Sequence, residues 1–255
     1  VNYFPISNGS GEFLLWEFPL AFWLEKQGYD VSYISNLDTH ADRAGLQRAK
    51  GWLSVGHDEY WTQQMYDNVV HARDNGVSLA FLSGNSVSGL VYLDPSTDGR
   101  PNRVFGRSKM FGQLARDLMG SSSHGTGMAD WTVEKPEHWI FAGTGMKKGD
   151  GISKLVGWEY HGTPSGNQPG LTILATAPTR PRDNRELNTR NVHTSTIYEL
   201  PKGNIVFDAG TCWWNMVLST PPGEMKPPRR DFSKDDPRVQ RITANVLKRM
   251  IEGKP

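Results

Sequence analysis

The chain has 255 residues, enough for one well-buried domain, and we expect a single domain over residues 1–255. Hydrophobic residues make up 37% and charged residues 22%, which is typical of a globular protein rather than of a disordered or fibrous one. The formal net charge of +1 produces no large field of either sign, so nucleic acid is not an expected partner.

The single cysteine, Cys212, excludes an intrachain disulfide framework and a multi-cysteine metal site, so oxygen and nitrogen would have to hold any metal. No apolar run approaches the roughly 20 residues that span a bilayer. We therefore expect no membrane partner and a cytoplasmic location. Since the sequence starts at Val1 rather than at Met, we also expect that an upstream portion was removed or omitted.

The first elements alternate between helix and strand. Apolar residues at helical spacing predict a helix from about Pro19 to Gly28, and the alternating run from Tyr29 to Ser35 predicts a strand. A short strand is expected over residues 50–56. A helix should follow it, with Thr62 as N-cap and Gly76 at its end, and with its inward face formed by Met65, Val69 and Val70.

The next run, residues 77–83, is almost continuously apolar, as in a strand that is buried on both faces. Strand, helix and strand in this order predict a parallel pair with a right-handed crossover. The carboxyl ends of the two strands, near His57 and Asn85, would then lie close together at one edge of the sheet.

The second half of the chain is richer in strands. We expect a helix over 108–119, a glycine-serine loop over 120–127, strands over 171–176, 195–199 and 204–208, and a final helix over 237–252 that Asp236 caps. The fold class is therefore α/β, with a largely parallel sheet flanked by helices and an additional β-rich C-terminal part.

The segment from Gly56 to Trp61 is the first candidate site. His57 and Glu59 lie two residues apart, so both side chains project from one face of an extended backbone, at the strand end where ligands bind in parallel sheets. The alternative is that Asp58 or Glu59 caps the following helix and His57 bonds a backbone carbonyl. Asn85 ends the neighbouring strand and could bond a substrate, or serve only as a turn residue.

A second candidate lies at Glu159 and His161, which repeat this spacing beside Trp158. The alternative is a solvated hairpin with polar residues on its outer face. Trp213 and Trp214 are expected to pack, and Cys212 to be a buried, inert thiol.

At this point the sequence resembles the C-terminal domain of the large (beta) subunit of bacterial N,N-dimethylformamidase and its relatives. The matching stretches follow the family's order over almost the whole chain, and they are residues 23–33, 56–61, 79–85, 155–159 and 236–247. The resemblance implies a glutamine-amidotransferase-like fold and an amidohydrolase with one iron ion, Fe³⁺, held by two tyrosines and a glutamate.

Carried over by motif, Glu59 matches the iron carboxylate, His57 and Asn85 match pocket residues beside it, and Glu159 matches a second essential carboxylate. The family's tyrosine ligands precede the helix before Tyr29, on a first strand that this chain lacks. Tyr3 is the only tyrosine in that region, so we assign it with Glu59 to the metal. Either the gene product is longer, or two ligands and the metal have been lost.

The first functional hypothesis is an iron-dependent, formamidase-like hydrolase of a small amide, with a small subunit or a homo-oligomer as possible partner. The alternative is a non-catalytic domain of the same fold that binds a ligand or a partner subunit. A third hypothesis is a metal-free hydrolase that uses Glu59 and His57.

Overall fold

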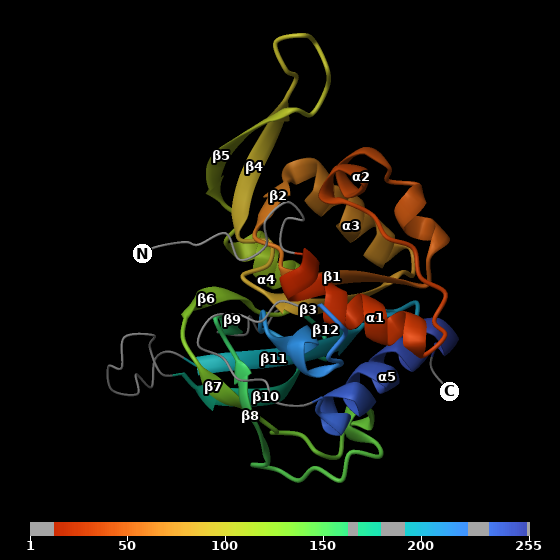
Figure 1. Cartoon of the computed structure of the whole chain (residues 1–255), viewed down its shortest axis with the longest axis vertical. Coiled ribbons are helices and arrows are strands. Elements are labelled where there is room, and N and C mark those ends of the chain that lie inside the picture. The colour runs from red at the N-terminus through yellow and green to blue at the C-terminus, as the bar shows by residue number, and fades with distance from the viewer. Residues whose placement is uncertain (1–12, 163–167, 180–191, 224–234, 254–255) are drawn as a thin grey trace.

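The computed structural model describes residues 13–162, 168–179, 192–223 and 235–253 (Figure 1). Its main sheet has the strand order β1-β3-β12-β11-β9-β6, and β10 pairs with β11. These strands are β1 (Gly51–His57), β3 (Ser78–Gly84), β6 (Ser122–Thr126), β9 (Glu159–Gly162), β10 (Thr172–Pro178), β11 (Val192–Glu199) and β12 (Ile205–Asp208).

The main sheet is mixed rather than largely parallel. β3 runs parallel to β1, as the strand-helix-strand pattern predicted, and also parallel to β12, whereas every pairing beyond β12 is antiparallel. Only residues 200–204 connect β11 to β12, and a connection this short permits an antiparallel pair but not a parallel one. The predicted combination of helices, strands and a β-rich later part is confirmed, and the predominance of parallel strands is corrected.

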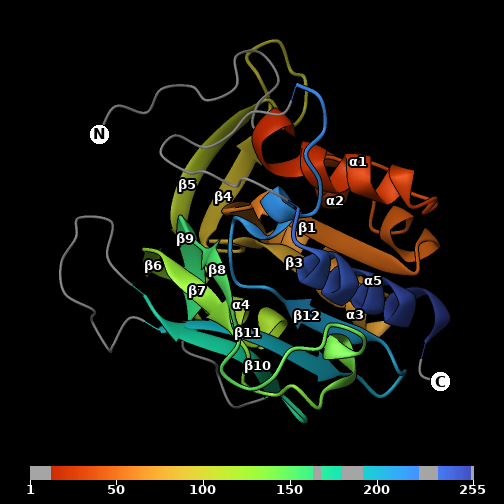
Figure 2. The same cartoon turned by 60° about the horizontal axis from the view of Figure 1, so that its bottom comes forward.

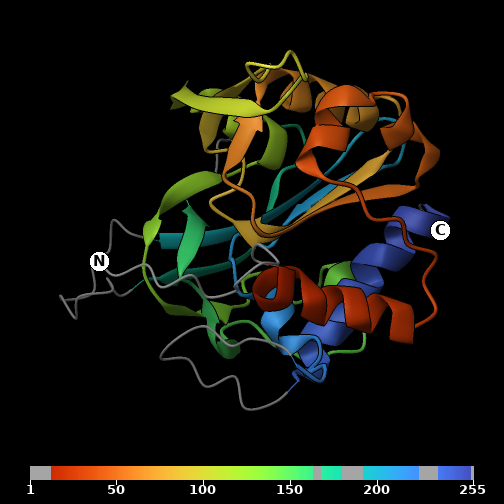
Figure 3. The same cartoon turned by 45° about the horizontal axis from the view of Figure 1, so that its top comes forward.

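Helices cover both faces of this sheet around β3 (Figure 3). Leu79 and Phe81 of β3 belong to one apolar cluster, with α3 (Gln63–Asp74) and α4 (Gln113–Met119), while Ala80 and Leu82 belong to another, with α1 (Phe18–Lys26) and α5 (Pro237–Glu252). Alternate side chains of a strand point to opposite faces, so β3 is buried on both, as predicted.

Two predicted helix starts are confirmed by their caps. The Thr62 hydroxyl accepts the backbone N–H of Met65 at the start of α3, where Met65 and Val69 are buried and Val70 is partly buried. Asp236 accepts the backbone N–H of Arg238 at the start of α5.

Three local predictions were wrong. Residues 29–35 form no strand: Tyr29 and Val31 pack against the core, which explains the alternation, but the chain then turns at Ser35 into α2 (Asn36–Ala41). The helix expected from residue 108 begins only at Gln113, after β5 (Val104–Met110). The expected loop over 120–127 contains β6, which pairs with β9.

Two smaller sheets extend the fold. β2 (Tyr60–Thr62), β4 (Gly89–Asp94) and β5 form one whose β4–β5 hairpin projects from the body (Figure 1). β7 (Ala129–Thr132) and β8 (Gly151–Val156) form the other, beside β10 (Figure 2). Within the described ranges, every helix is too short or too polar to cross a membrane.

Candidate functional site

The site forms where β1 and β3 end together. In their parallel register His57 is opposite Gly84, so Asn85, the next residue, leaves the sheet beside the His57 ring. The distance between His57 Nε2 and Asn85 Nδ2 is 3.3 Å. The predicted proximity of these two strand ends is confirmed.

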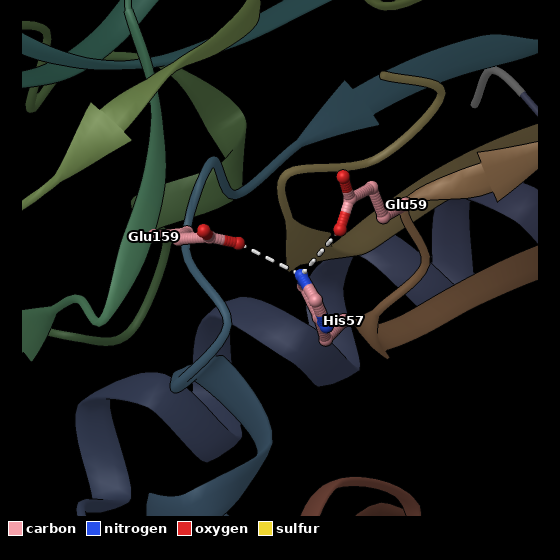
Figure 4. A group of neighbouring side chains, drawn as sticks. All are labelled: His57, Glu59 and Glu159. Carbon is pink, nitrogen blue, oxygen red and sulfur yellow. Dashed lines mark hydrogen bonds and ion pairs between the residues drawn. The ribbon is translucent and has the colours of Figure 1, made fainter. Parts of the chain in front are cut away.

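Glu159 reaches the same point from β9. Its Oε2 lies 2.8 Å from His57 Nε2 (Figure 4). This approach depends on Gly84, because a Cβ on that residue would lie 2.4 Å from the Glu159 carbonyl oxygen and 2.6 Å from the Cys212 nitrogen. Glycine at the end of β3 therefore lets the backbone of residue 159 pass close enough for its side chain to meet His57.

Glu59 completes a cluster of one imidazole and two carboxylates. The distance from Glu59 Oε2 to His57 Nε2 is 3.6 Å, and Figure 4 shows that Glu59 and Glu159 approach this nitrogen from different sides. The side chains of His57, Glu59 and Glu159 are only 14%, 14% and 19% exposed, so their charges are partly desolvated. Their ligand atoms all lie within 4.8 Å of one another, and a nitrogen with two carboxylate oxygens is a donor set that can hold a divalent or trivalent cation.

The backbone and a neighbouring serine set the orientation of Asn85. Its φ of 53° is a left-handed conformation, which asparagine adopts more readily than most residues. The Ser123 hydroxyl of β6 donates to Asn85 Oδ1, so that Nδ2 is the end that faces His57. Ser123 was not identified from the sequence, since its run of serines between glycines reads as a loop.

Aromatic rings form one wall of the site. The ring centroids of Trp158 and His57 are 4.9 Å apart, and Trp158 stacks on Trp16 at 6.1 Å. Gly56 permits this packing because a Cβ there would lie 2.3 Å from the Trp16 Cβ. An apolar, planar surface thus lies beside the charged cluster.

Asp58 points away from the cluster, as expected for the middle residue of an extended triplet. It accepts hydrogen bonds from Asn36 Nδ2 at 3.1 Å and from Ser54 Oγ at 2.9 Å. Burial raises the pKa of the Asp58 carboxyl, and these two hydrogen bonds oppose the rise. Asp58 therefore stabilises the backbone after β1 through these hydrogen bonds, while His57 and Glu59 project from the opposite face of the segment.

The structure decides between several interpretations of the sequence. Thr62 caps α3, so neither Asp58 nor Glu59 has that role. β9 is an inner strand between β11 and β6, with His161 fully buried, so the solvated hairpin was the wrong alternative. Cys212 and Trp214 are buried, as predicted. Tyr3, the other assigned metal ligand, lies outside the described residues.

Fold and site together define a mixed α/β protein. At the carboxyl ends of its parallel strands β1 and β3, a histidine lies between two glutamates. Residues 4–228 match the family model described as N,N-dimethylformamidase beta subunit-like, C-terminal, and the chain belongs to that family. No curated protein matches the sequence.

Proposed function

We propose that the chain is a hydrolase that cleaves the C–N bond of a small amide. One observation carries the proposal: His57 and Glu159 form a hydrogen-bonded acid-base pair beside Glu59 and Asn85, in a chain of the dimethylformamidase-like family. Amide hydrolysis needs groups that accept a proton from water, stabilise the carbonyl oxygen and return a proton to the leaving nitrogen.

Iron is the cofactor that we propose, with Glu59 as its carboxylate ligand. The chemistry of Glu59 supports this choice, since its carboxylate is partly buried beside His57 and carboxylate oxygen suits a hard cation, while His57 and Glu159 bond each other. Tyr3 is a further proposed ligand from outside the described residues. When bound, the ion would supply Lewis-acid polarisation of an amide carbonyl.

The His57–Glu159 pair would handle the protons. Two carboxylates lie near Nε2, which favours the imidazole proton on that nitrogen, where Glu159 accepts it across 2.8 Å. In this tautomer Nε2 cannot also accept from Asn85 Nδ2, which lies 3.3 Å away. During hydrolysis the pair would take one proton from the attacking water. Once the new C–O bond has formed, it would return that proton to the nitrogen as the C–N bond breaks.

Asn85 would orient the substrate. Because Ser123 fixes its Oδ1, the Nδ2 group faces the cluster and can donate to the carbonyl oxygen of a bound amide. Trp158, which stacks on the buried Trp16, would contact the alkyl groups of that amide, since indole rings bury apolar surface efficiently.

A non-catalytic domain that binds a ligand or a partner subunit is the second candidate. The observation in its favour is the aromatic wall of Trp158 and Trp16, because aromatic side chains are enriched where proteins bind partners. A metal-free hydrolase is the third.

Iron content and activity, measured together, separate these candidates. The purified chain should contain near-stoichiometric iron and release amine from N,N-dimethylformamide or formamide, and Glu59→Gln should lose both. Glu252→Gln, at a carboxylate whose side chain is 63% exposed near the end of α5, is the matched control and should keep both. Activity that survives a chelator would favour the metal-free hydrolase, and folded protein with neither iron nor activity would favour the binding domain.

A further inference from the structure

A second histidine lies on the same strand as Glu159 and does not reach the solvent. His161 and Asp208 have no exposed surface, and His161 Nδ1 is 2.9 Å from both carboxylate oxygens of Asp208. On its other side, His161 Nε2 accepts the backbone N–H of Ser86 at 3.0 Å. The imidazole thus connects β9 and β12 to the turn that follows β3.

These contacts fix the tautomer of His161. A backbone N–H can only donate, so Nε2 carries the lone pair and the ring proton is on Nδ1, which faces Asp208. Asp208 also accepts the N–H of Gly210 at 3.0 Å and the hydroxyl of Ser121. The carboxylate is therefore held from several directions, and the ring it orients cannot rotate without breaking these bonds.

The bond from Ser86 bears directly on Asn85. Asn85 leaves β3 in a left-handed conformation, and its neighbour in the chain is the residue that His161 holds. Ser123 holds the Asn85 side chain from β6, and it pairs with His161 in the β6–β9 register. Side chain and backbone of Asn85 are thus tied to the same pair of strands, one of which also carries Glu159.

We propose that His161, oriented by Asp208, is a positioning residue that holds the turn at Asn85–Ser86 against β9, so that Asn85 keeps its place beside His57. His161 does not touch the substrate, because it is fully buried. This role rests on the proposed hydrolase function, since it concerns the geometry in which that reaction takes place.

Two substitutions at residue 161 separate the two hydrogen bonds of the ring. His161→Gln places an amide oxygen near the position of Nε2, where it can accept the Ser86 N–H. His161→Asn reaches only as far as Nδ1, so it keeps the bond to Asp208 and loses the bond to Ser86. We expect kcat to fall about 10²-fold in His161→Asn, because a group that is displaced from its working position loses about that much. In His161→Gln the fall in kcat should be much smaller, and KM should change little in either variant.

A double-mutant cycle with Asn85→Ala tests whether the effect passes through Asn85. If His161 acts by positioning Asn85, His161→Asn should change kcat by less than about twofold once Asn85 is absent. A general structural role would instead lower kcat by the same factor in both backgrounds, and that result would overturn the proposal.

Hydrogen exchange of the Ser86 amide, measured by NMR on the full chain, gives a readout that needs no activity. The amide should be protected in the wild type and in His161→Gln, and should exchange at least about tenfold faster in His161→Asn. Unprotected Ser86 in the wild type, or equal protection in the two variants, would overturn the positioning role. If His161→Asn does not fold, the comparison of the wild type with His161→Gln still tests the positioning role. A Ser86 amide that is protected in the wild type but not in His161→Gln would overturn that role. A wild type without amidase activity would refute the proposed function, while the exchange rates would still decide whether His161 holds the turn.

Discussion

His57 and Glu159 are 102 positions apart in the sequence, yet His57 Nε2 and Glu159 Oε2 are separated by 2.8 Å. β1 carries the first residue and β9 the second, and between these strands in the sheet lie β3, β12 and β11. The contact is possible because β9 passes close to the end of β3, where Gly84 has no side chain. The contact between His57 and Glu159 therefore depends on the pairing of all the strands between them.

Glu159→Gln should remove the acid-base function of the pair while keeping the shape of the side chain. We expect kcat for amide hydrolysis to fall by about 10²–10⁴-fold, the usual contribution of a general acid-base group. The thermal unfolding midpoint should change little. Glu252→Gln, on the surface of α5, is the control, and a kcat equal to that of the control would remove Glu159 from the mechanism.

Gly84→Ala should disturb fold and site together. The new Cβ would lie 2.4 Å from the carbonyl oxygen of Glu159, and backbone atoms cannot move away as easily as a side chain. We expect a loss of about 1–3 kcal/mol in the free energy of unfolding, with a fall in kcat. In the control, Gly151→Ala, the nearest atom would be at 3.3 Å, and urea unfolding should show a smaller loss. Equal losses would contradict the account of how β9 reaches His57.

Ser123→Ala should act through Asn85. Without the hydroxyl, Asn85 Oδ1 loses its donor and the amide can turn, so we expect kcat to fall about tenfold, which corresponds to one hydrogen bond. Ser153→Ala, at an exposed position of β8, is the matched control. The Asn85 side-chain amide signals in an NMR spectrum should shift in Ser123→Ala and stay in place in the control.

His193 should make the protein less stable in acid. Burial lowers the pKa of its imidazole to about 4, although the bond from Nε2 to the Ala209 carbonyl opposes the shift. Because the folded-state pKa is below the unfolded value of about 6.5, the neutral ring stabilises the fold above pH 6.5, and this contribution is lost as the pH falls toward 4. The loss attributable to this group is at most about 3 kcal/mol.

His193→Gln should remove that part of the pH dependence, since glutamine does not titrate and its amide can donate to the same carbonyl. Urea unfolding between pH 7 and pH 4 measures the difference. His124→Gln, at an exposed histidine, is the control. If the stability of His193→Gln fell as steeply as that of the wild type, another group would have to be responsible.

The part of the site that could be predicted from the sequence depends on local patterns. The strand-helix-strand order brought His57 and Asn85 to one sheet edge, and the spacing of His57 and Glu59 put both side chains on one face. Both inferences need only the period of a strand and the direction of parallel pairs.

What could not be predicted depends on antiparallel pairing over long distances. The position of Glu159 follows from β9 pairing with β11 and β6, and the roles of Ser123 and His161 follow from the same pairing. A usable signal existed for Asp208, because this acidic residue ends the strand predicted over 204–208, and ligands bind at the carboxyl ends of strands in α/β sheets. Residues 29–35 were wrongly predicted as a strand because alternate side chains of this segment pack on the core. The same alternation occurs in a strand, but within the described residues this segment pairs with no other strand.

In the proposed function, the cluster of His57, Glu59 and Glu159 hydrolyses a small amide. The most direct test is the rate of amine release from N,N-dimethylformamide by the purified, iron-loaded chain, compared with Glu59→Gln and Glu159→Gln. We predict multiple turnovers by the wild type and rates at least about 10²-fold lower in both variants. Amine release by the wild type that does not exceed the buffer rate, or that both variants match, would contradict the account.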